Sequence, residues 1–255
     1  MDEARYFELL VAIHQGLPRQ GPGTGASTRK ALSQLGPLPE NAAILDLGCG
    51  SGAQTLDLVA ATSPKVKITA VDIHMVFLEE LLRKSTVLGL SSRLTVGQGD
   101  MANLNIPEAS FDVIWSEGAI YLMGFQQGLE YWKRFLKPGG MVAVTEATWF
   151  TDSPPQPAQE FWAKGYPAMQ DEAANIRDME AAGYEYVGGF RLPETAWRDE
   201  YYGPLRTRMP RLREKFADDP DALAVLDETQ AEMDMYEAHG DSYGYAFFLG
   251  RLRGE

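Results

Sequence analysis

The sequence predicts an α/β protein built on a doubly wound, mostly parallel sheet of seven strands. Three observations lead to this fold. Strand-like apolar runs alternate with helical stripes between residues 42 and 149, a glycine-rich loop follows the first run, and two aromatic-rich strands come after residue 183. Such alternation covers both faces of a parallel sheet with helices, and right-handed crossovers favour double winding.

Five apolar runs predict the parallel strands, at residues 42–48, 65–72, 93–100, 110–118 and 141–149. Helical spacing of apolar residues predicts helices at 51–61, at 74–88 and around 129–136. Gly89 closes the second of these helices, and Lys137-Pro138-Gly139-Gly140 closes the third.

The segment before the first strand predicts two helices joined by a lid loop. Apolar spacing gives a helix at 3–15, and Ser27 or Thr28 could cap a short helix that ends at Gly36. The loop between them contains RQGPG (19–23), which we expect to fold over a ligand and exclude water. Residues 1–40 are therefore expected to form the N-terminal helices and lid.

The last hundred residues predict a helical cap and the edge of the sheet. Residues 152–183 and 194–240 are mostly helical, and strands are expected at 184–192 and 243–252. We expect residues 41–150 to form the ligand-binding core, and residues 151–255 to form the cap together with the last two strands.

Composition and charge exclude several classes of function. The chain has 255 residues and a net charge of −13, which opposes binding to nucleic acid or to an anionic membrane. Cys49 is the single cysteine, the three histidines are scattered without metal-ligand spacing, and the first residues are acidic. These features predict a cytoplasmic protein with no metal site.

The glycine loop predicts a nucleotide-like ligand without identifying it. Gly48-x-Gly50-x-x-Ala53 satisfies the dinucleotide fingerprint, and Asp72 ends the next strand, where an acid binds ribose hydroxyls. Both features suit NAD and S-adenosylmethionine equally well.

Asp46, two residues before Gly48, separates the two ligands by charge. A carboxylate repels a pyrophosphate but attracts a sulfonium and an α-ammonium group. At about 4 Å and an effective dielectric near 20, the interaction is on the order of 4 kcal/mol before desolvation. Its sign favours S-adenosylmethionine, although Asp46 could instead cap the following turn.

The motifs resemble those of class I S-adenosylmethionine-dependent methyltransferases. ILDLGCGSG is similar to the first motif, Val71-Asp72 to the second and Gln98-Gly99-Asp100-Met101 to the third, and Phe111–Trp115 and Leu136–Gly140 follow in the family's order. RQGPG, SEGAIY and YGYAFFLGR are further similar to a bacterial group related to ubiquinone/menaquinone-type methyltransferases. The resemblance implies a Rossmann-like methyltransferase fold whose last strand is antiparallel. It also implies adenine contacts at Asp100 and Met101.

Two sets of site residues follow from these motifs. The expected cofactor-binding residues are Asp46, Gly48, Cys49, Gly50, Asp72, Ile73, Asp100, Met101, Ser116 and Glu117. The expected substrate-binding residues are Tyr121, Trp149, Tyr166, Trp197 and Tyr201, although each aromatic ring could instead be core. Glu117 and Tyr121 are the catalytic candidates, and Glu117 could bind the cofactor's ammonium, act as a base or cap the next helix.

The sequence therefore predicts methyl transfer from S-adenosylmethionine to a small molecule, with S-adenosylhomocysteine as product. The cap aromatics favour a planar or apolar acceptor, and Ser116-Glu117-Gly118 lacks the Asn/Asp-Pro-Pro-aromatic motif of DNA amino-methyltransferases. Non-catalytic binding of the same cofactor and an NAD-dependent oxidoreductase are the alternatives. The acceptor atom and the oligomeric state stay open.

Overall fold

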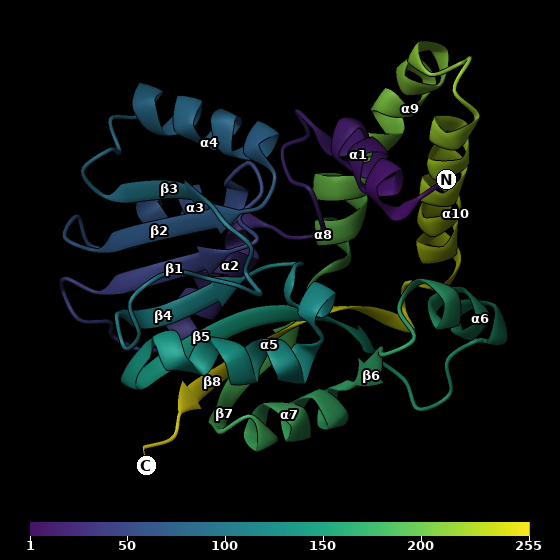
Figure 1. Ribbon diagram of the computed structural model, residues 1–255. Helices are drawn as coiled ribbons and strands as arrows, with labels where there is room; N and C mark the ends of the chain where they lie inside the picture. The colour runs from purple at the N-terminus through teal and green to yellow at the C-terminus, as the bar shows by residue number, and fades with distance from the viewer. Residues whose placement is uncertain (255) are drawn as a thin grey trace.

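The computed structural model describes residues 1–254, which form one sheet with helices on both faces (Figure 1). The strands are β1 (Ala43–Leu47), β2 (Lys67–Asp72), β3 (Leu94–Gln98), β4 (Phe111–Ser116), β5 (Leu136–Trp149), β6 (Gln170–Asp171), β7 (Tyr184–Arg191) and β8 (Tyr243–Leu252). Their order is β3-β2-β1-β4-β5-β8-β7, with β6 beside β5.

The strand directions confirm the predicted winding. Strands β3, β2, β1, β4 and β5 pair in parallel, whereas β8 runs antiparallel to both β5 and β7. The order reverses direction at β1, because β2 and β3 lie on one side of it and β4 and β5 on the other. The two-residue strand β6 was not expected; it adds an eighth strand to the predicted seven.

Alternating side chains of the strands build a core on each face of the sheet. On β1, Ile44 points to one core and Leu45 to the other. Helices α2 (Gly25–Gln34), α3 (Ala53–Ala61) and α4 (Met75–Val87) cover the first face. Helices α5 (Phe125–Trp132) and α7 (Glu172–Ala181) cover the second. Period-two strands between helices thus give the layered architecture that the sequence predicts.

The cap stands at the carboxyl ends of the strands (Figure 1). It consists of α1 (Glu3–His14), α6 (Gln156–Gly165), α8 (Glu194–Trp197), α9 (Gly203–Lys215) and α10 (Pro220–His239). Leu9 and Ile13 of α1 are buried in the same core as Leu226 and Met233 of α10. The N-terminal helix is therefore part of the cap.

The expectation that all of residues 152–183 belong to the cap is wrong. Helix α7 packs against the sheet beside α5, where Met179 joins Leu129 and Trp132 in the second core. The amphipathic pattern of the segment predicts a helix but carries no information on which surface covers it. The division of the chain at residues 40 and 150 remains a prediction.

Two predicted boundaries are also wrong. Leu136 begins β5 and pairs with Phe111, so the predicted helix ends earlier than the apolar stripe suggests. Thr24 caps α2 by accepting a hydrogen bond from the Ser27 amide, which displaces the expected caps Ser27 and Thr28 by one turn. In residues 1–254 we find no helix that combines the length and the apolar character needed to cross a membrane.

Candidate functional site

The carboxyl ends of β1, β2 and β4 meet at one edge of the sheet and bring acidic residues together. In register, Asp46 of β1 lies opposite Ala70 of β2 and Trp115 of β4. Asp72 ends β2, and Glu117 follows β4. Ligands of doubly wound sheets bind in this position, where the strand order reverses.

The loop after β1 requires glycine at two positions. Gly48 and Gly50 have φ of +67° and +53°, a backbone region that side chains disfavour. A Cβ at Gly48 would lie 2.3 Å from the Cβ of Ala119, and one at Gly50 would lie 2.6 Å from Oε1 of Gln20. Cys49 between them is buried, and burial raises the pKa of its thiol well above the ordinary value, so its side chain packs and is unreactive.

Asp72 holds the loop and keeps acceptor capacity for a ligand. Its Oδ2 accepts a hydrogen bond from the Gly50 amide at 2.8 Å, and its Oδ1 accepts one from the His74 amide at 2.8 Å. A carboxylate offers about four lone-pair sites, so further donors such as ribose hydroxyls can still be bound. The position of Asp72 suits the role that the sequence predicts.

Asp46 is held by two side chains of α3, and it is not the cap of that helix, whose N-cap is Gly52. Its side chain is fully buried and accepts hydrogen bonds from Thr55 at 2.5 Å and Gln54 at 3.3 Å, both on α3. Burial raises the pKa of Asp46 to about 7, against which the two hydrogen bonds act. The carboxyl therefore carries less charge than the electrostatic argument assumes, and α3 occupies both of its oxygens.

The residues expected around an adenine ring border the same loop. Ile73 is 55% exposed directly after Asp72, so its side chain is accessible to a ligand at this edge of the sheet. Oδ1 of Asp100 accepts a hydrogen bond from the Ala102 amide, and Asp100 is otherwise exposed. Sδ of Met101 lies 4.0 Å from the point where a Gly48 Cβ would stand. These residues and the glycine loop therefore border one region.

The predicted lid loop is docked onto the site. Oε1 of Gln20 accepts a hydrogen bond from the Ser51 amide at 2.8 Å, so the loop contacts the glycine loop directly. Arg19 is buried and forms ion pairs with Asp57 at 3.1 Å and with Glu117 at 3.4 Å. The N-terminal segment thus bridges α3 and the end of β4.

Glu117 is held by three donors. Besides Arg19, the Thr28 hydroxyl donates to it at 2.7 Å and the Trp115 indole at 2.9 Å. Burial raises the pKa of Glu117, and Arg19 opposes that shift. No side chain caps the following short helix, η1 (Ile120–Met123), so the capping interpretation of Glu117 is wrong. Its engaged oxygens also make it a poor base.

The predicted substrate aromatics form two groups in the structure, one inside the cap and one beside α6. Trp197 is 3% exposed and stacks on Tyr236 with ring centroids 4.6 Å apart, so it is core of the cap. The Tyr201 hydroxyl lies 2.8 Å from Nε2 of His14 inside the cap. Tyr121, in η1 after β4, is 37% exposed, so its ring is not part of the core.

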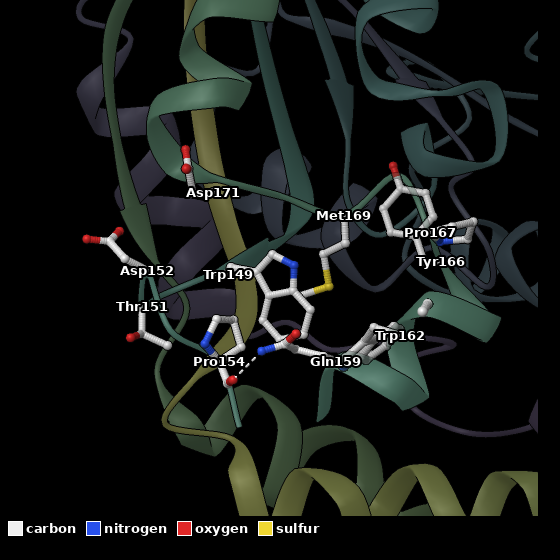
Figure 2. Close-up of a pocket in the computed structure, with 11 residues that line it drawn as sticks. Trp149, Thr151, Asp152, Pro154, Gln159, Trp162, Tyr166, Pro167, Met169 and Asp171 are labelled. Carbon is white, nitrogen blue, oxygen red and sulfur yellow. Dashed lines mark hydrogen bonds between the residues drawn. The ribbon is translucent and has the colours of Figure 1, made fainter. Parts of the chain in front are cut away.

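Trp149 and Tyr166 line a cavity of about 410 Å³ beside α6 (Figure 2). Trp162 and Met169 complete its aromatic and apolar wall. Tyr166 also contacts the ring of Tyr121 edge to face, at 5.7 Å between centroids. Of the five predicted substrate residues, Tyr121 and Tyr166 thus lie together, and Trp197 lies apart in the core.

Sequence reasoning missed Glu146, a buried acid near the end of β5. The signal was present, because Glu146 is the only charged residue in the apolar run MVAVTEATW. The same pattern identified Asp72.

The donors and spaces at the edge of the sheet fit S-adenosylmethionine. The hydroxyls of Ser51 and Ser116 are buried without a hydrogen-bond partner in the described structure. Ser51 lies in the glycine loop, and Ser116 is the last residue of β4. Together with the free lone pairs of Asp72 and the exposed Ile73, they offer polar and apolar contacts to a nucleoside with an amino-acid tail. Among residues 1–254, no cluster of His, Cys, Asp and Glu is arranged to hold a metal ion.

The fold and this edge define a Rossmann-like protein that binds a nucleoside cofactor at the switch point of its sheet. Residues 44–140 match the methyltransferase domain family, and they run from β1 with its glycine loop to the first residues of β5. This match favours S-adenosylmethionine-dependent methyl transfer over the NAD-dependent alternative.

Known proteins agree with the assignment. The chain is 26% identical over 190 residues to the uncharacterized methyltransferase YodH of Bacillus subtilis, covering 74% of this chain and 78% of YodH. It is 25% identical over 170 residues to the demethylmenaquinone methyltransferase of Lactobacillus johnsonii, covering 65% and 70%. A methyltransferase from Geobacter sulfurreducens, solved with S-adenosylhomocysteine, has the same fold with a TM-score of 0.79 at 21% identity, covering 98% of each chain.

Proposed function

We propose that this methyltransferase acts on a small molecule held between the carboxyl ends of β4 and β5 and the cap. The observation that carries this proposal is the edge-to-face contact of Tyr121 with Tyr166, at 5.7 Å between centroids, which joins the segment after β4 to the cavity of about 410 Å³ beside α6. Such a space suits a small acceptor with a planar or apolar part, since aromatic rings form its wall. The demethylmenaquinone enzyme is, by its name, also a small-molecule methyltransferase.

Several residues of this chain would hold the cofactor. The Gly48–Gly50 backbone would approach its amino-acid tail, Asp72 would accept from the ribose hydroxyls, and Ile73 and Met101 would enclose the adenine. Asp100 would accept from the adenine amino group, and the free hydroxyl of Ser116 would face the tail. When bound, S-adenosylmethionine supplies a methyl group on a sulfonium; a nucleophile attacks that methyl group in line with the sulfur, which leaves as a thioether.

The remaining residues contribute position and exclusion of water. Arg19 and Gln20 keep the lid on the glycine loop, and Glu117 fixes the lid through Arg19 and Thr28. A nucleophile aligned with the methyl group gains much of its acceleration from that alignment alone. Tyr121 contributes an aromatic wall through its edge-to-face contact with Tyr166.

Calorimetric titration with S-adenosylhomocysteine tests the cofactor site. We expect one-to-one binding to the wild type and a loss of about tenfold to 100-fold in affinity for Asp72→Ala, since hydrogen bonds to a charged group contribute about 1.5–3 kcal/mol. The matched control is Asp218→Ala, an exposed aspartate before α10, which should bind as the wild type does. Equal affinity of the two variants would refute the assigned cofactor site.

A further inference from the structure

Glu146 is buried at the carboxyl edge of the sheet, where the Tyr166 side chain is its polar neighbour. Its side chain is 2% exposed, and neither carboxyl oxygen has a hydrogen-bond partner in the described structure. Burial raises the pKa of Glu146 to about 8, although the nearby Tyr166 side chain and the Ala147 backbone oppose the shift. A carboxyl in this state costs folding free energy. This cost indicates that the Glu146 carboxyl binds a ligand.

Its location continues the row of acids along the edge of the sheet. Ser116, the last residue of β4, pairs with Val144 of β5, so Glu146 lies two residues further along, level with Gly118. The Gly118 amide donates to the Thr145 hydroxyl at 2.7 Å, which fixes the two strand ends together. Glu146 is thus one strand beyond Glu117 and two strands beyond the glycine loop, on the side where we place the acceptor.

The neighbours of Glu146 are aromatic and acidic. Tyr121 and Tyr166 meet edge to face beside it, and the pKa of Tyr245 is raised by burial first and then by Tyr121 and Glu146. A second carboxyl, Glu232 of α10, accepts from Tyr202 at 2.7 Å and also raises the pKa of Tyr121. Within residues 1–254, no lysine or arginine lowers the pKa of either carboxyl. The region beside Tyr121 and Tyr166 therefore contains two acids without a cationic partner in the described structure.

Two acids beside tyrosine rings attract a cation. Tyrosine faces attract ammonium groups, and a desolvated carboxyl becomes ionised when a cation lies against it. A phenolate or alkoxide nucleophile would be repelled by the same two carboxyls. In methyl transfer to nitrogen, positive charge moves from sulfur to nitrogen, whose remaining N–H groups can still donate to an oxygen of the protonated carboxyl.

We propose that the methyl acceptor is an amine and that Glu146 binds its nitrogen and takes its proton. The inference rests on the proposed function. The ammonium proton passes to the Glu146 carboxylate, and the freed nitrogen lone pair forms the new N–C bond. The C–S bond breaks with its electron pair left on sulfur. The products are a methylated ammonium and S-adenosylhomocysteine, and the proton on Glu146 leaves to solvent.

The test compares amines with neutral molecules of the same shape. Full-length protein saturated with S-adenosylhomocysteine is titrated with 2-phenylethylamine and butylamine, each against the alcohol of the same skeleton. The wild type is compared with Glu146→Gln, which preserves shape, and with Glu185→Gln, the same change at an exposed position of β7. Release of S-adenosylhomocysteine from S-adenosylmethionine is then followed with each amine and each alcohol across pH.

We expect at least one amine to bind about tenfold or more tightly than its alcohol in the wild type and in Glu185→Gln, and this preference to vanish in Glu146→Gln. Turnover of that amine should fall about 100-fold in Glu146→Gln, and the basic rise in its pH profile should disappear. Affinity for S-adenosylhomocysteine should stay within about twofold in all three proteins, which separates loss of the carboxyl from misfolding.

Three results would overturn the inference while leaving the proposed function intact. They are equal binding of amines and alcohols, turnover of the alcohols alone, and no binding of either amine at about 10 mM, a concentration that would detect even very weak affinity. Failure of the wild type to bind S-adenosylhomocysteine would instead refute the proposed function itself.

Discussion

Replacing Gly48 by alanine should damage the cofactor site without unfolding the protein. The backbone at this position has φ of +67°, which costs a side-chain-bearing residue about 1–2 kcal/mol. The new Cβ would also lie 2.3 Å from the Cβ of Ala119. Because carbon atoms normally approach to about 3.5–4 Å, the Ala119 segment must move by roughly 1 Å.

The two effects add to about 2–5 kcal/mol, since overpacking alone costs about 1–3 kcal/mol. A domain of ordinary stability, about 5–15 kcal/mol, survives this loss. The shift matters more for binding, because Ala119 stands between Glu117 and Tyr121 on the edge of the site. We expect Gly48→Ala to bind S-adenosylhomocysteine at least about tenfold more weakly than the wild type.

Gly36→Ala is the matched control for this experiment. Gly36 has φ of +79°, but a Cβ there would have nothing within 4 Å. Urea unfolding should therefore show only the backbone cost, about 1–2 kcal/mol, and calorimetry should show unchanged binding. If the two variants lost equal stability and both kept full affinity, the steric argument at Gly48 would be refuted.

Two further predictions concern buried charges. Arg19→Ala should lower the free energy of unfolding by about 3–5 kcal/mol, because it leaves Glu117 buried without its cation. Urea unfolding measures this loss. A loss below about 1 kcal/mol, which is typical of a surface ion pair, would contradict the buried salt bridge. The pKa of Glu146 is raised from 4.5 to about 8 in the folded state, so its protonated form stabilises the empty protein below pH 4.5 and this contribution is lost as pH rises through 8. Stability of the wild type should thus fall by about 1.4 kcal/mol per pH unit across that window relative to Glu146→Gln, and parallel urea-unfolding profiles of the two proteins would rule this out.

The sheet could be predicted because its signals are local. The first four strands of the parallel core are short apolar runs that end at or just before a glycine or an acid, and the expected boundaries agree with β1 to β4 to within a few residues. The glycine loop was equally readable, since a positive φ at Gly48 and Gly50 selects the residue type directly.

Features that depend on distant partners could not be predicted. Asp46 and Asp72 look alike in the sequence, yet α3 occupies the first and leaves the second open to a ligand. Helix α7 covers the apolar groups of the second sheet face that α5 leaves uncovered. The spacing of apolar residues along α7 predicts a helix but does not indicate which surface that helix covers. Trp197 and Tyr121 are both aromatic residues near strand ends, and only tertiary packing makes one core and the other a wall.

The docked lid has a consequence for the timing of exchange. Arg19 and Gln20 hold the N-terminal segment on the glycine loop, while Leu9 and Ile13 of the same segment are buried with α10. A ligand that leaves the glycine loop therefore requires the buried ion pair between Arg19 and Glu117 to open. Because the same segment packs on α10, that opening also loosens the cap over the acceptor site. Escape of the spent cofactor and entry of the next acceptor are thus tied to one motion, whose rate can set the pace of the whole cycle.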